Sequence, residues 1–180
     1  MRKLLGVLAV GAALAFAPGV QAGGGPVIVH ADIGASIPLP GLCSFDVTVT
    51  ITGTATVKLW LNDAGLVVRE QDTAPNSRFT YSSANGSFSF EGNLVSWSDY
   101  GSGAVLGGSA DVRLSGLFGH VPGYIASDAG QLVLSNSEVI AFNDVEGALV
   151  PLTDGGDVTK STGHHNSNDA IGAAICAALS

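Results

Sequence analysis

Charged side chains are scarce in this sequence, and most of those present are acidic. They make up 12% of the 180 residues, about half of the ~25% usual in soluble domains. Only 7 side chains are Lys or Arg against 15 Asp or Glu, which excludes a protein that binds nucleic acid through a basic surface. The 46% of hydrophobic residues exclude an intrinsically disordered chain, and the 25 glycines are unsuited to coiled coils or helical bundles.

Long apolar runs are also missing, except at the N-terminus. Arg2 and Lys3 precede an apolar run over residues 4–17, which is shorter than the ~20 residues that span a bilayer. The small residue Ala22 then offers a cleavage site. We predict a signal peptide over residues 1–22, with a signal anchor that stays in the membrane as the alternative. The chain from residue 23 is expected to be secreted, extracellular and without a membrane span.

Removal of that segment makes the chain strongly acidic. Without Arg2 and Lys3 it carries 5 basic and 15 acidic side chains, a formal net charge of −10. Such a charge favours solubility and opposes binding to nucleic acid or to anionic lipid. It does not identify a partner, and the expected partner is an extracellular ligand or surface of unknown identity.

Only two cysteines are present, Cys43 and Cys176. Exported chains meet oxidising conditions, so an even pair is expected to form one disulfide. The alternatives are a metal-binding pair or a catalytic thiol, but neither a Cys-x-x-Cys spacing nor an adjacent histidine supports them.

The hydrophobic pattern over residues 45–61 has a period of two, which predicts a half-buried antiparallel strand rich in Thr and Val. Trp60 breaks this pattern, because it falls on the polar side. Strands then recur about every ten residues, with turns expected at Asn85-Gly86 and over residues 128–130. Ile171, Ile175 and Leu179 have helical spacing, which predicts a short helix over about 168–179.

These elements predict an all-β fold, an antiparallel meander closed as a β-sandwich or a small β-barrel, with a short C-terminal helix. Residues 23–42 are interpreted as an N-terminal extension and 43–180 as a single β-domain. Within that domain, residues 150–166 are expected to form a polar loop.

Few residues suggest catalysis or metal binding, so no catalytic residue, metal or cofactor is assigned. His164 and His165 are weak candidates for metal binding, because adjacent loop residues point apart and a metal site needs three or four convergent ligands. His30 and His120 stand alone, with no motif around them. No nucleophile elbow or phosphate-binding glycine loop is present.

Aromatic residues provide the other candidates. Trp60, Trp97 and Tyr100, together with Tyr124, are possible contacts for a carbohydrate or another ligand, although aromatics in a small β-domain usually belong to the core or its rim. The off-pattern position of Trp60 is the one positive sign of exposure.

Two short motifs carry a resemblance. Cys43-Ser44-Phe45-Asp46 opens the Val/Thr strand, and Cys176-Ala177-Ala178-Leu179 ends the chain. This layout resembles small secreted β-rich proteins of actinobacteria, whose function is unknown. The resemblance implies an exported β-domain and transfers no catalytic residue.

Three hypotheses remain open. The first is a secreted, non-enzymatic β-domain that binds a surface, a glycan or a protein. The second is a small-molecule carrier with an apolar barrel interior. The third is an enzyme, which would require His30, His120 or the 164–165 pair to meet a carboxylate in a cleft.

Overall fold

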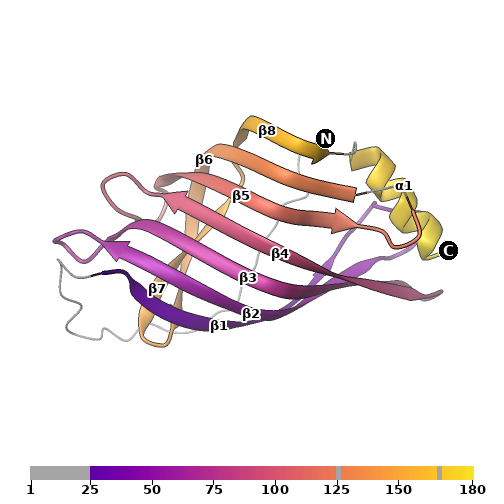
Figure 1. The fold of residues 1–180 in the computed structure, drawn as a ribbon, viewed down its shortest axis with the longest axis horizontal. Helices are drawn as coiled ribbons and strands as arrows, with labels where there is room; N and C mark the ends of the chain where they lie inside the picture. Colours follow the sequence, from indigo (N-terminus) through magenta and orange to yellow (C-terminus); the bar gives the residue numbers. More distant parts are fainter. Residues whose placement is uncertain (1–24, 125–126, 166–167) are drawn as a thin grey trace.

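The computed structural model describes residues 25–124, 127–165 and 168–180. The expected signal peptide, residues 1–22, therefore lies outside the described residues. The regular structure of the described part is β-strand apart from one C-terminal helix, which confirms the all-β prediction (Figure 1). Its elements are β1 (Val27–Pro38), β2 (Thr48–Leu61), β3 (Val67–Ser82), β4 (Ser87–Asp99), β5 (Ser109–His120), β6 (Ser127–Val145), β7 (Ala148–Asp154), β8 (Asp157–His165) and α1 (Asn168–Ala178).

All eight strands belong to one antiparallel sheet, and each strand from β1 to β7 pairs with the next in the sequence. β6 is 19 residues long and has two partners on one side. β7 pairs with its C-terminal part, and β8 pairs with its N-terminal part, so β7 and β8 follow each other along one edge of the sheet.

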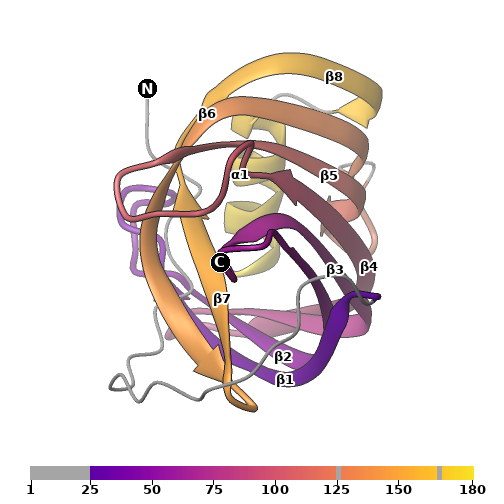
Figure 2. The ribbon, with the colours of Figure 1, turned by 90° about the vertical axis from the view of Figure 1, so that its left-hand side faces the viewer.

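The sheet curves strongly around its inner face but does not close (Figure 2). β1 is one edge, and β7 with β8 forms the other. The two edges meet at one point, where the backbone amide of His30 in β1 donates to Glu146 Oε2 in the β6–β7 turn at 3.0 Å. The predicted closure as a sandwich or barrel is therefore wrong, because no ladder of backbone hydrogen bonds joins β1 to the opposite edge among the described strands.

The inner face of the sheet holds two separate hydrophobic clusters. The period-two pattern of β2 supplies both, since Val57 and Leu59 enter the first cluster and Val47, just before the strand, enters the second. The other buried members of the first cluster are Val29, Val67, Tyr100, Ala104, Ala110, Val112, Leu134, Val139 and Val150. The second cluster forms beneath α1, where Val121, Ile175 and Leu179 are buried with Val47.

A row of glycines crosses three strands near the α1 end of the sheet. Gly116 of β5 pairs with Gly130 of β6, which pairs with Gly163 of β8. All three have positive φ angles, 135°, 148° and 113°. A Cβ atom at Gly116 would meet the backbone of Asn93, and one at Gly130 would meet the backbone of Thr162. Glycine therefore allows a close approach and a bend that side chains would prevent.

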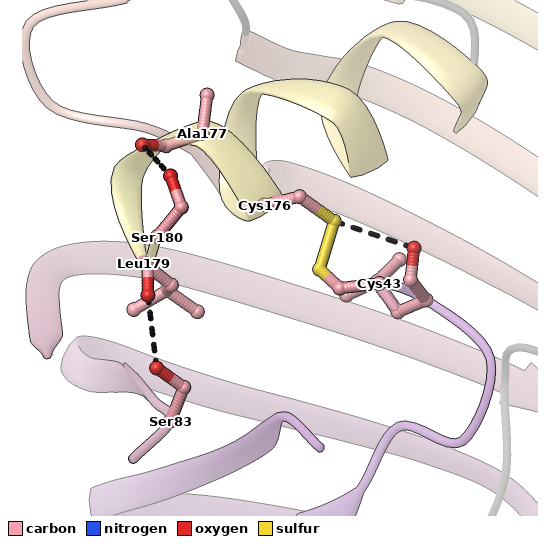
Figure 3. Close-up of a disulfide and its surroundings, with 7 residues drawn as sticks. Cys43, Ser83, Cys176, Ala177, Leu179 and Ser180 are labelled. Carbon is pink, nitrogen blue, oxygen red and sulfur yellow. Dashed lines mark hydrogen bonds between the residues drawn. A yellow bond between two sulfur atoms is a disulfide. The ribbon is translucent and has the colours of Figure 1, made fainter. Parts of the chain in front are cut away.

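The C-terminal helix is fastened to the inner face of this curved sheet (Figure 2). Cys43 and Cys176 form a disulfide with a Cα–Cα distance of 5.6 Å, which confirms the predicted pairing (Figure 3). A few residues further on, the Ser83 hydroxyl donates to the Leu179 carbonyl at 3.0 Å. The predicted helix is also confirmed, with Ile175 on its buried side, and Leu179, the residue after the helix, is buried as well.

Three segments differ from their sequence-based interpretation. Residues 23–42, interpreted as an extension, contain β1, which pairs with β2 along its whole length. Residues 150–166, interpreted as a loop, contain most of β7 and all of β8. Residues 128–130, interpreted as a turn, lie inside β6, because the sheet needs Gly130 at its bend rather than in a hairpin.

Candidate functional site

Two tryptophans lie side by side on the outer face of the sheet. Trp60 belongs to β2 and Trp97 to β4, with β3 between them. Their ring centroids are 6.0 Å apart and their planes differ by 21°. Trp97 is 36% exposed and Trp60 is half-buried. The off-pattern phase of Trp60 thus indicated correctly that its side chain faces away from the core.

Polar side chains of β3 and β4 lie beside the two rings. The register places Arg69 opposite both Trp60 and Asp99, and it places Gln71 opposite Trp97. The Arg69 guanidinium is 3.8 Å from the Asp99 carboxylate, with both side chains more than half exposed. At this distance and exposure the pair contributes little to stability and stays accessible to a ligand. We call these five residues the tryptophan surface.

An open hollow of about 430 Å³ adjoins this surface. Its lining residues are Trp60, Leu61, Val68, Arg69, Asp99 and Gly101. The hollow therefore combines an aromatic ring, aliphatic side chains, a guanidinium and a carboxylate. Such a combination suits a ligand with both apolar faces and hydrogen-bonding groups, because the ring packs against C–H groups while the polar side chains fix orientation.

Tyr100, the third aromatic candidate, does not join the tryptophans. It is 4% exposed and lies on the inner face, where its hydroxyl donates to Glu70 Oε2 at 2.6 Å. Near this pair, the Ser96 hydroxyl donates to Asp72 Oδ2 at 2.7 Å. The burial of Tyr100 was not predicted from the sequence. Its neighbours on the same face of β4, Ser96 and Ser98, are polar, so the pattern did not identify that face as the inner one.

The two carboxyl groups of this network have shifted pKa values. Burial raises the pKa of Glu70 well above its ordinary value, and the nearby charge of Asp72 raises it further, against the effect of the Tyr100 hydrogen bond. Burial also raises the pKa of Asp72, against the effect of Ser96. Glu70 is 3% exposed, so its carboxyl group offers no oxygen to a ligand in solution.

The histidines are distributed over separate elements. His30 lies on β1 with its Nδ1 3.3 Å from the Thr56 hydroxyl, His120 ends β5 with its ring edge-on to Phe90, and His164 is exposed on β8. His165 also belongs to β8, which places the two weak metal candidates on a strand rather than a loop. Over residues 25–124, 127–165 and 168–180, no three His, Cys, Asp or Glu side chains are grouped closely enough to hold a metal ion.

Comparison with family models, with curated proteins and with solved structures finds no significant match. In the part of the chain that the structure describes, no helix has the length and apolar character needed to cross a membrane. Function is therefore inferred from the side chains of this chain alone, and the tryptophan surface is its strongest candidate site.

Proposed function

We propose that this protein is a secreted, non-enzymatic binding protein that holds an extracellular glycan on its tryptophan surface. The observation that carries the proposal is the pair of tryptophans, Trp60 and Trp97, placed 6.0 Å apart on the outer face. Burial of large aromatic rings is strongly favourable. A pair that stays partly exposed forgoes some of this stabilisation, so its position beside polar side chains favours a role in binding.

Two further observations support a ligand on the outside of the sheet. The inner face is occupied by the protein's own side chains, in the two hydrophobic clusters and in the network around Glu70. Sugar rings present C–H groups on their faces and hydroxyl groups at their edges. Trp97 offers a flat apolar partner for such a face, and Gln71 and Arg69 offer hydrogen-bonding groups beside it.

The export part of the proposal is supported by the disulfide, since such bonds persist in oxidising compartments. It is tested by expressing the full chain in a secreting bacterial host and sequencing the N-terminus of the protein from the medium. We expect a chain that starts at residue 23. A chain retained in the cells with Met1 intact contradicts export.

Glycan binding is tested by affinity electrophoresis of the secreted protein through gels that contain soluble neutral or acidic polysaccharides. The chain has two tryptophans, and both belong to the tryptophan surface, so a change of intrinsic fluorescence on titration reports directly on this site. We expect at least one polysaccharide to retard the protein. Trp97→Ala is expected to weaken this binding by at least about ten-fold, because buried aromatic contacts dominate such interfaces.

Tyr124→Ala is the matched control, because Tyr124 is also an exposed aromatic residue, at 43%, but lies between β5 and β6 and away from the tryptophan surface. Its binding is expected to equal that of the wild type. The proposal is wrong if no polysaccharide retards the protein, or if Trp97→Ala and Tyr124→Ala bind equally well.

A further inference from the structure

The few basic residues of this acidic protein are not spread evenly over its surface. Beyond the predicted signal peptide the chain has five, Lys58, Arg69, Arg78, Arg113 and Lys160. Arg78 forms an ion pair with Glu91 at 3.2 Å, far from the tryptophans. The other four lie on β2, β3, β5 and β8 in two adjacent rows across the outer face, as the register shows.

One of these rows runs straight through Trp97. Residues that pair across neighbouring strands point to the same face of a sheet. Successive pairs join Lys58 to Gln71, Gln71 to Trp97, Trp97 to Arg113, Arg113 to Val133 and Val133 to Lys160. We call these six residues the cationic row. It crosses five strand-to-strand steps, which is a length of about 24 Å at ~4.8 Å per step.

The charges of the cationic row are available to a ligand. It contains three cations and no carboxylate, and within the described residues none of these cations forms an ion pair. Arg113 and Lys160 are exposed. The row on one side adds Arg69 but also Asp99 and Asp111. The row on the other side holds His30, one apolar residue of β4 and five uncharged polar residues of β2, β3, β5, β6 and β8 (Val95, and Thr56, Thr73, Ser115, Gln131 and Thr162).

We infer that the ligand of the tryptophan surface is an acidic polysaccharide, which lies along the cationic row and crosses the strands. This inference rests on the proposed function and adds to it the charge and the direction of the ligand. Four of the five basic residues beyond the predicted signal peptide lie in these two rows, whereas the chain has 15 acidic side chains. The two rows therefore attract anions locally, although the surface as a whole repels them.

The chemistry of the row matches both parts of such a ligand. The rings of Trp97 and Trp60 provide the surface on which a sugar ring packs. Lys58 lies two strands from Trp97 on one side, and Arg113 lies one strand from it on the other. At these positions they can contact carboxylate or sulfate groups on neighbouring sugars. The adjacent Thr, Ser and Gln side chains can donate to and accept from hydroxyl groups.

The test uses pairs of polysaccharides that share a sugar backbone, one member charged and the other neutral. The purified, disulfide-bonded protein is titrated with polygalacturonate and with its methyl ester, then with dextran sulfate and with dextran, while tryptophan fluorescence is recorded. We expect at least one charged polymer to bind at least about ten-fold more tightly than its neutral counterpart. Raising the NaCl concentration from about 50 to about 500 mM should reverse most of this difference, because salt screens exposed charges.

Charge-removing variants locate the site. Lys58→Gln with Arg113→Gln is expected to lower affinity for the charged polymer by about four- to twenty-five-fold, or two- to five-fold for each exposed contact. Arg78→Gln is the control, because it removes one positive charge from the same face about 20 Å away along β3. Its affinity should stay within two-fold of the wild type's, at about the level expected for a screened, distant charge.

Each other outcome overturns a different statement. Equal binding of charged and neutral polymers would show that the ligand is a neutral glycan, so the inference fails while the proposed function stands. Equal binding of poly-L-glutamate and polygalacturonate would show that charge is recognised without sugar. An equal loss in Arg78→Gln and in the double variant would refute the cationic row as the site. If no polysaccharide binds at all, the proposed function fails as well.

Discussion

The disulfide between Cys43 and Cys176 is expected to supply a large part of the stability of this protein. The two residues are 133 positions apart, so the bond closes a loop that contains most of the domain. The chain-entropy model assigns about 5 kcal/mol to closing a loop of this length in the unfolded state. Native disulfides typically contribute 2–5 kcal/mol, so we expect a loss of about 3–5 kcal/mol on removal.

The perturbation is Cys43→Ser with Cys176→Ser, which leaves the contacts of α1 in place. Ile175 and Leu179 are 4% and 1% exposed and are buried with Val47 and Val121, while Cys43 packs at the edge of this cluster, where serine occupies nearly the same space. The folded state therefore changes little, and the loss comes mainly from the greater freedom of the unfolded chain. The m-value should rise for the same reason, because the unfolded state without the cross-link exposes more surface.

The assay is equilibrium unfolding in urea, followed by tryptophan fluorescence and by far-ultraviolet circular dichroism. With an m-value of about 2 kcal/mol/M, the midpoint should fall by about 2 M. Ser44→Ala, next to the first cysteine and on an exposed residue, serves as the control and should shift the midpoint by less than about 0.3 M, since such surface changes stay within ~0.5 kcal/mol. A double variant within about 1 kcal/mol of the wild type would refute the entropic argument.

Two further predictions concern the interior. The raised pKa of Glu70 means that the folded state holds its proton to higher pH than the unfolded state does, so the contribution of Glu70 to the free energy of unfolding should be fully present below about 4.5 and be lost as pH rises through the raised pKa. Urea titrations at several pH values should show this slope in the wild type and a shallower one in Glu70→Gln, and an identical slope in the two would contradict it. Gly116→Ala should lower the free energy of unfolding by more than about 2 kcal/mol, because its Cβ would meet the backbone of Asn93 at a φ of 135°. Thermal unfolding measures this, and an unchanged midpoint would show that the strands separate there without loss.

Much of the fold was predictable where one face of a strand is apolar. The alternation through Val47, Val57 and Leu59 identified β2, and the same rhythm in Val27 and Val29 marks β1, although that segment was interpreted as an extension. β8 carried no such signal, because an edge strand with both faces in water has no need of apolar residues. Closure was not predictable either, since it depends on whether the two distant edges pair.

The candidate site was predictable in part. Trp60 stood out because it broke the pattern of its strand, and the structure brings it to Trp97. Tyr100 was grouped with them as another aromatic residue, but it faces the interior, on the same side of β4 as the buried Ser96 and Ser98. The cationic row could not be predicted from the sequence, because Lys58 and Lys160 fall on one line only through the register of the strands between them.

The aligned glycines Gly116, Gly130 and Gly163 also restrict how β5, β6 and β8 can pair. A slip of one residue in β6 would bring Ala129 or Gln131 to the place of Gly130, and its side chain would then collide with the backbone of the neighbouring strand. Slipped pairings are excluded by collision as well as by loss of hydrophobic contacts. The three glycines thus fix the register of strands whose apolar patterns are too weak to fix it alone.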